Sequence, residues 1–298
     1  MLQGRLVKTK GGFYFVQSPQ GEIIRCRARG RFKEKGIELL VGDLVEVNED
    51  KQVIDKVYSR KNRLVRPPVA NVDLVVVLIS VLKPPLDLFL LDRILVSAHA
   101  SSLEAIICLN KMDLVTSHDQ NKFKDIEKVL RDCGYRVILS SAVTGEGFEE
   151  LRFALQGKIT VFAGPSGAGK STVINKLKPE LNLLSGPVSE KTERGRHTTR
   201  HVELLGLDKT TFVADTPGFQ RLDLKGISST ELYSFFPEIA SKSSCRFNNC
   251  LHNQEPGCAV KEAWQKGEIA PWRYEHYLEF LKEIQQREKM IYRKRGED

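Results

Sequence analysis

The sequence has no long apolar run. Its first residues, MLQGRLVKTKGG, hold no apolar stretch that would serve as a signal peptide. The longest apolar run, Val72–Leu82, is too short to cross a bilayer and is typical of a strand buried on both faces of a parallel sheet. We therefore expect a cytoplasmic protein with no membrane partner.

The chain also has few cysteines, and half of its six are crowded together. Cys245, Cys250 and Cys258 fall within fourteen residues that also contain His252. In a reducing compartment this clustering indicates a bound metal rather than disulfides. Reactive or merely buried thiols are the alternative.

Acidic charge is scarce at the N-terminus. Residues 1–66 carry 15 Lys and Arg against 8 Asp and Glu, which is most of the chain's net charge of +8. A basic module on a nearly neutral remainder favours a polyanionic partner, although a basic surface also promotes solubility.

Residues 1–66 alternate short strands with Gly- and Pro-containing turns. Five such strands favour a small closed barrel of the OB-fold kind, and Pro67–Pro68 marks its end. The predicted strands are Gly4–Thr9, Phe13–Gln17, Glu22–Ala28, Asp43–Asn48 and Gln52–Tyr58.

From Asn71 the pattern changes to strands alternating with helices, which predicts a doubly wound α/β sheet with active loops at the carboxyl ends of its strands. We expect a multi-domain α/β protein with a barrel at 1–67, the α/β domain at 68–226 and a helical metal-binding domain at 227–298. The predicted strands are Val72–Val81, Ala105–Leu109, Arg136–Leu139, Lys158–Ala163, His201–Leu205 and Thr211–Ala214, and the predicted helices are Asp87–Ala98, Asp119–Cys133, Gly147–Leu155, one from Lys170 and Trp272–Arg293.

The strongest motif is GPSGAGKS at 164–171, between a predicted strand and a predicted helix. Its glycines let backbone N–H groups face a phosphate at the helix N-terminus. Lys170 is expected to reach the β- and γ-phosphates, and the Ser171 hydroxyl to bind Mg²⁺. The motif alone does not name the base, because nucleotide kinases carry nearly the same string.

Two further segments favour guanine. NKMD at 110–113 follows a predicted strand, and the Asp113 carboxylate can accept hydrogen bonds from the ring N–H and exocyclic amine of guanine. Adenine offers neither donor in that arrangement. Ser140-Ser141-Ala142 follows the next strand, where backbone N–H groups can support the guanine carbonyl.

Two segments are expected to sense the γ-phosphate. In DTPG at 215–218, Asp215 can hold Mg²⁺ through water and the Gly218 N–H can meet the phosphate. In the preceding GRHTTR segment, we favour Thr199 over Thr198 as the threonine that closes over the phosphate and binds Mg²⁺. An ordinary surface loop is the alternative for this second segment.

These five segments look like the guanine-nucleotide motifs of translation-factor-like GTPases in a circularly permuted order, with NKMD and SSA before the P-loop. With the basic barrel and the C-terminal cluster, the whole chain resembles the bacterial ribosome small subunit-dependent GTPase A family. The predicted GTP-binding residues are Asn110, Lys111, Met112, Asp113, Ser140, Ser141, Ala142, Gly164, Pro165, Ser166, Gly167, Ala168, Gly169, Lys170, Ser171, Thr172, Asp215 and Gly218.

The cluster Cys245, Cys250, His252 and Cys258 matches a closed tetrahedral zinc site, which we assign to folding rather than catalysis.

The water-orienting group of catalysis has no motif of its own. Phe219 follows DTPG directly, at the position where many GTPases have a water-orienting glutamine. The family that this chain resembles also has an apolar residue at that position. His197 is the local candidate for that role, and simple packing is its alternative.

The resemblance implies a monomeric GTPase that binds the 30S subunit and 16S rRNA during late assembly, with slow turnover that the ribosome stimulates. Two other functions stay open. A nucleotide kinase would explain the P-loop but not NKMD, SSA and DTPG. An RNA-binding protein that uses nucleotide only for stability would not need the intact Lys170 and Ser171.

Overall fold

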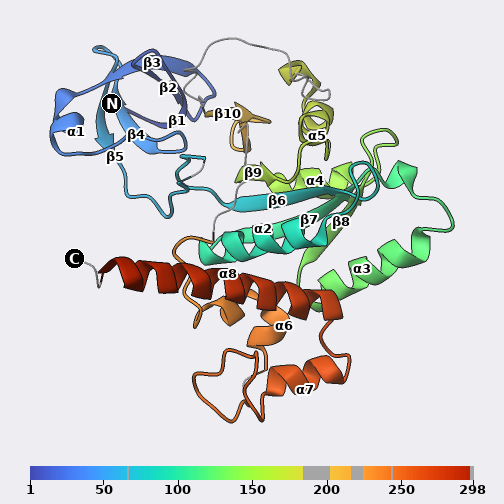
Figure 1. Ribbon diagram of the computed structural model, residues 1–298. Coiled ribbons are helices and arrows are strands. Elements are labelled where there is room, and N and C mark those ends of the chain that lie inside the picture. The colour runs from blue at the N-terminus through green and yellow to red at the C-terminus, as the bar shows by residue number, and fades with distance from the viewer. Residues whose placement is uncertain (66, 184–201, 216–223, 243, 296–298) are drawn as a thin grey trace, which may run out of the picture. The chain divides into compact units, whose positions relative to one another are not determined.

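The computed structural model describes residues 1–65, 67–183, 202–215, 224–242 and 244–295 (Figure 1). The chain divides into two compact units. The first comprises Met1–Leu86, Ile106–Leu114 and Ile138–Arg221, and the second comprises Asp87–Ala105, Val115–Val137 and Leu222–Asp298.

The first unit begins with the predicted barrel. Its strands are β1 (Leu2–Lys10), β2 (Phe13–Gln17), β3 (Ile23–Ala28), β4 (Leu44–Asn48) and β5 (Val53–Val57). They close in the order β1-β2-β3-β5-β4-β1, with only β3 and β5 parallel. The closed five-stranded ring confirms the predicted OB-like barrel. A short helix that the sequence did not predict, α1 (Gly30–Glu34), adds Phe32 to the barrel core.

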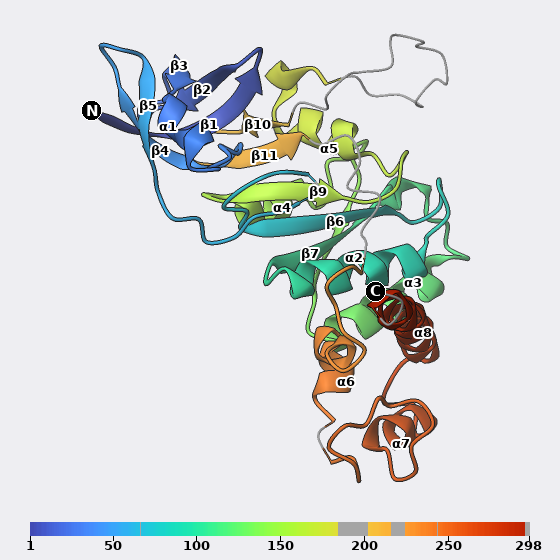
Figure 2. The same cartoon turned by 60° about the vertical axis from the view of Figure 1, so that its left-hand side comes forward.

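The remaining strands of the sheet are β6 (Leu74–Ser80), β7 (Glu104–Asn110), β8 (Arg136–Ser140), β9 (Ile159–Ala163), β10 (Glu203–Gly206) and β11 (Phe212–Asp215). They lie in the order β10-β11-β9-β6-β7-β8, of which Figure 2 labels the first five. Strand β9 runs parallel to both β6 and β11. Every residue of β6 is buried, as its continuous apolar run predicts. Because β6, β9 and β11 are parallel, their carboxyl ends lie at the same edge of the sheet.

The barrel and the α/β region share this sheet, which the sequence did not predict. Strand β1 pairs with β10 through Lys8 and Glu203, and their side chains form an ion pair of 2.7 Å. One continuous sheet of eleven strands results.

Helices α4 (Phe148–Leu155) and α5 (Lys170–Leu177) pack in the core of the first unit. Leucines and valines of α4, α5 and β6 fill this core, in which Leu74, Leu78, Leu151 and Val173 have no exposed surface. Because α5 starts at Lys170, its buried face fixes the position of the loop before it.

The second unit is helical. It contains α2 (Leu88–Ala100), α3 (Gln120–Asp132), α6 (Pro237–Ala240), α7 (Ala259–Gln265) and α8 (Pro271–Arg295). Asp87 caps α2 by accepting a hydrogen bond from the Leu90 N–H at 2.9 Å. The unit's core joins Val96 of α2 to Tyr277, Phe280 and Leu281 of α8.

Helices α2 and α3 thus group with the C-terminal region, although the sequence pattern placed them in the α/β domain. The three-domain division at 67/68 and 226/227 stays a proposal. No helix among the described residues is both long enough and apolar enough to cross a membrane.

Candidate functional site

The P-loop follows β9 and leads into α5, as its motif predicts. A Cβ atom on Gly164 would lie 2.0 Å from the Leu78 carbonyl oxygen, so only glycine fits there. The Lys170 Nζ donates hydrogen bonds to the carbonyl oxygens of Gly164 and Pro165, both at 2.8 Å. Burial lowers the pKa of Lys170. The Lys170 side chain therefore folds back onto the first residues of the P-loop. An anion bound there would favour the charged form of the lysine.

The NKMD segment at the end of β7 contacts the P-loop directly. The Asn110 side-chain amide donates to the Ala168 carbonyl oxygen at 2.9 Å, and the Lys111 Nζ donates to the Gly167 carbonyl oxygen at 2.7 Å. Gly169 must lack a side chain, because a Cβ there would lie 2.6 Å from the Asn110 Nδ2. Segments 56 to 58 residues apart in sequence thus form one surface.

Ser140, the last residue of β8, and Ser141 after it hold the NKMD segment in place. The Ser140 hydroxyl donates to the Asn110 Oδ1 at 3.1 Å, and the Ser141 hydroxyl donates to the Asp113 Oδ1 at 2.5 Å. The Val143 N–H also donates to the Ser141 oxygen, at 3.2 Å. The sequence predicted backbone support from this segment, and the hold of the Ser141 side chain on Asp113 was missed.

A buried thiol lies under this arrangement. The Cys108 Sγ is 3.1 Å from the Ser140 Oγ, and burial raises the pKa of the thiol to about 12. Cys108 is therefore a neutral partner that helps to hold Ser140. It does not fit a reactive cysteine.

The other predicted nucleotide contacts lie at several places in the structure. Met112 begins a short 3₁₀ helix, Met112–Leu114. Ser166 is exposed within the P-loop, and Thr172 is exposed in the first turn of α5. Asp215 ends β11, which pairs with β9 ahead of the P-loop. His197, Thr198, Thr199, Gly218 and Phe219 lie outside the described residues.

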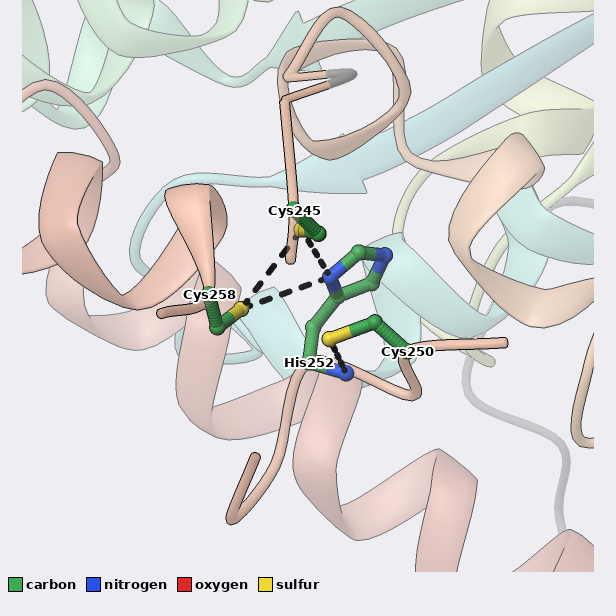
Figure 3. Close-up of side chains that lie close together, drawn as sticks. All are labelled: Cys245, Cys250, His252 and Cys258. Atoms are coloured by element: carbon green, nitrogen blue, oxygen red, sulfur yellow. Dashed lines mark hydrogen bonds between the residues drawn. The ribbon is translucent and has the colours of Figure 1, made fainter. Parts of the chain in front are cut away.

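The Cys/His cluster forms a compact group in the second unit (Figure 3). The Sγ atoms of Cys245 and Cys258 each lie 3.5 Å from the His252 Nδ1, and 4.0 Å from each other. Ideal tetrahedral zinc gives about 3.6 Å between sulfur and nitrogen and about 3.8 Å between sulfurs, from the usual bond lengths. With Cys250, all four ligand atoms lie within 4.8 Å of one another. The donor set therefore fits one tetrahedral metal ion.

Helix α8 holds the loop that carries these ligands. The Tyr274 hydroxyl donates to the His252 carbonyl oxygen at 2.7 Å, and the Tyr277 hydroxyl donates to the Leu251 carbonyl oxygen at 2.8 Å. Glu255 accepts hydrogen bonds from the N–H groups of Leu251 and Asn253, both at 2.9 Å. The loop's backbone is thus fixed from two sides, which is the arrangement of a structural site.

The comparison with family models decides the family. A model described as RsgA GTPase matches residues 57–225, and one described as RsgA N-terminal domain matches residues 3–54. This chain belongs to the RsgA GTPase family. It is therefore a GTP hydrolase, and the predicted fold class, with a barrel before a circularly permuted GTPase domain, is confirmed.

Relatives and solved structures agree along almost the whole chain. The small ribosomal subunit biogenesis GTPase RsgA of Caldanaerobacter subterraneus subsp. tengcongensis is 46% identical over 98% of this chain and 99% of its own length. The protein of that name from Moorella thermoacetica is 44% identical, covering 97% and 99%.

Among solved structures, YjeQ from Thermotoga maritima has a TM-score of 0.84 at 37% identity, covering 95% of this chain and 98% of its own. YloQ, titled a circularly permuted GTPase, has a TM-score of 0.82 at 38% identity, covering 96% of each chain. The RsgA GTPase family thus accounts for the barrel, the permuted motifs and the region that carries the cluster.

Proposed function

We propose that this chain acts in late assembly of the small ribosomal subunit, binding the 30S particle and hydrolysing GTP to GDP and phosphate under its stimulation. The observation that carries the nucleotide part is the contact of Asn110 and Lys111 with the P-loop. This contact joins the segment proposed to bind guanine to the loop proposed to bind the phosphates. The relatives are named small ribosomal subunit biogenesis GTPase RsgA, which supports the small ribosomal subunit as the partner.

The site residues have separate roles in this proposal. Asp113, oriented by Ser141, accepts the two guanine donors, and the P-loop N–H groups with Lys170 hold the phosphates. Ser171, Thr199 and Asp215 would hold Mg²⁺, which neutralises phosphate charge when bound. His197 is the proposed water-orienting residue, because Phe219 cannot hold water.

We assign the Cys/His cluster to one zinc ion that stabilises the fold. Two thiolates and an imidazole nitrogen at near-tetrahedral separations, with Cys250 completing the set, leave no position open for a substrate. The basic barrel is the proposed contact with 16S rRNA, and a cytoplasmic monomer is the proposed state. The boundaries 1–67, 68–226 and 227–298 are the proposed domains.

The test is a titration of purified 30S subunits into a phosphate-release assay with GTP, and with ATP as the control. Slow release from GTP alone should rise steeply with 30S, while release from ATP stays at background. An unchanged GTP rate across the titration would contradict the ribosomal role.

A further inference from the structure

One row of charged residues crosses from the barrel to the DTPG segment. Strand β1 pairs with β2 and β4 of the barrel, and its Lys8 also pairs with Glu203, the first residue of β10. The ladder continues to the next strand, where Glu203 lies opposite Asp215, the last residue of β11. Lys8, Glu203 and Asp215 therefore occupy matching positions on three neighbouring strands.

Two of the three residues in this row are carboxylates. Asp215 is the residue of DTPG that is proposed to hold Mg²⁺, and its carboxylate and the Ser171 hydroxyl are oxygen donors of the kind that Mg²⁺ takes. Like charges at opposite positions of a ladder repel one another. An unpaired Glu203 would therefore add a second negative charge beside the residue proposed to hold the metal.

Lys8 supplies the cation that balances Glu203. The Lys8 Nζ lies 2.7 Å from the Glu203 Oε2, and no other lysine or arginine is ion-paired with Glu203 among the residues that the structure describes. Both side chains line a pocket of about 800 Å³, and they are 35% and 38% exposed. Because water reaches Glu203, its carboxylate would stay ionised without its partner. Loss of the lysine would thus leave an uncompensated negative charge.

The barrel fixes the position of Lys8. The strand register shifts between Leu6 and Lys8, and the extra residue turns Lys8 away from the face on which Leu6 is buried in the barrel core. Arg5 of the same strand donates to the Gly42 carbonyl oxygen at 3.0 Å, and its guanidinium lies 5.9 Å from the centre of the Phe212 ring in β11. The strand that carries Lys8 is therefore held both to the barrel and to the α/β sheet.

We propose that Lys8 is a positioning residue of the nucleotide site, which pairs with Glu203 and so keeps a second negative charge away from Asp215 and the bound phosphates. This proposal rests on the metal role proposed for Asp215, and it gives the barrel a part in nucleotide binding. Repulsion grows with the product of the charges, and GTP is more negative than GDP even with Mg²⁺ bound. The pair should therefore favour GTP over GDP.

The test uses the full-length, zinc-loaded protein and titration calorimetry at saturating Mg²⁺ with a non-hydrolysable GTP analogue and with GDP. The variants are Lys8→Met, Glu203→Gln and the double variant with both changes. Lys10→Met is the matched control, because it removes the same charge from an exposed position two residues further along β1. Denaturant unfolding of each protein shows whether the fold is intact.

Lys8→Met should weaken binding of the GTP analogue about fivefold, the upper range for one half-exposed charge, and binding of GDP by less. Glu203→Gln leaves no orphaned carboxylate, so it should stay within about twofold of the unchanged protein, and so should the double variant. Lys10→Met should bind both nucleotides normally. The unfolding midpoints of all variants should agree, which separates the effect on affinity from an effect on the fold.

Unchanged affinity for the GTP analogue in Lys8→Met would overturn the proposal, as would a loss that persists in the double variant. Asp215→Asn tests the metal role separately, because it should remove the Mg²⁺ dependence of analogue binding. That result beside an unaffected Lys8→Met would show that this inference fails while the proposed metal site stands. Persistent Mg²⁺ dependence in Asp215→Asn would contradict the metal role, and this inference with it.

Discussion

The nucleotide site and the Cys/His cluster are built in opposite ways. The first gathers residues from β7, the loop after β8 and the P-loop, and holds them with hydrogen bonds between segments up to 58 residues apart. The second takes four ligands from a single stretch of fourteen residues. The first is therefore a product of sheet topology and the second of one short loop.

Exposure separates the two sites further. Asp113 and Ser166 are exposed, as groups that meet a soluble nucleotide must be. Cys250, His252 and Cys258 are 8%, 5% and 2% exposed. Changes at the cluster should therefore reduce the free energy of unfolding, whereas changes at the nucleotide site should reduce GTP affinity and leave stability nearly intact.

Loss of a cluster ligand should have the largest effect. Cys258→Ser is expected to abolish stoichiometric zinc and to cost about 4 kcal/mol or more, because it removes a structural metal from a buried site. Elemental analysis and denaturant unfolding measure the two effects. Cys26→Ala, in the barrel core, should keep one zinc ion per chain. Normal zinc content in Cys258→Ser would contradict the assignment.

A buried ion network should have the next largest effect on the second unit. Arg273 is 1% exposed and donates to Glu238 at 2.6 Å and to Asp92, which also bonds the His276 Nδ1. Arg273→Met should cost about 3–5 kcal/mol, because it leaves two carboxylates buried without their cation. Denaturant unfolding measures this loss in the free energy of unfolding.

Lys242→Met is the control for this variant. It breaks a more exposed pair with Glu268 in the same unit and should cost less than about 1 kcal/mol. Equal losses for the two variants would mean that burial does not set the strength of this network.

Substitutions at two glycines with positive φ distinguish the effect of backbone strain from the effect of a close contact with Asn110. Gly169→Ala places a Cβ 2.6 Å from the Asn110 Nδ2, whereas Gly157→Ala meets nothing within 4 Å. Both should lose about 1 kcal/mol of stability from the left-handed backbone. Only Gly169→Ala should also lose GTP affinity, measured by titration calorimetry. Unchanged affinity would show that the Asn110 contact does not shape the P-loop.

The smallest expected effect belongs to Ser141→Ala. It frees the Asp113 carboxylate from its hydroxyl donor and should weaken GTP binding by about 1 kcal/mol with little change in unfolding. Thr116→Ala removes a comparable hydroxyl donor, to Asp119 on the surface, and should leave affinity unchanged. If Ser141→Ala lowers stability but leaves GTP affinity unchanged, Ser141 supports the fold and does not orient Asp113 for GTP binding.

Local pattern predicted much of the fold. Alternating residues placed the barrel strands, and the apolar run at Val72–Leu82 placed β6, because burial on one or both faces leaves a direct imprint on sequence. The P-loop and the cluster were found because their chemistry requires fixed spacing.

Contacts between distant segments were missed. The bond from Ser141 to Asp113 depends on β7 and β8 lying side by side, and the pair Lys8–Glu203 depends on how the barrel continues into β10. Arg273 shows the same limit, since an arginine beside an apolar helical stripe is normally assigned to solvent. Its two carboxylate partners come from α2 and α6, far from it in sequence.

Binding of GTP and of xanthosine triphosphate, compared in the unchanged protein and in Asp113→Asn, tests directly whether Asp113 recognises guanine. Xanthine carries a carbonyl where guanine carries its exocyclic amine, so an amide at position 113 can donate where the carboxylate accepted. The variant should lose about 3 kcal/mol of GTP affinity, a factor of about 100, and should bind xanthosine triphosphate more tightly than the unchanged protein does. Unaltered preference for GTP in Asp113→Asn would show that NKMD does not read the base, and would contradict the assignment of this site.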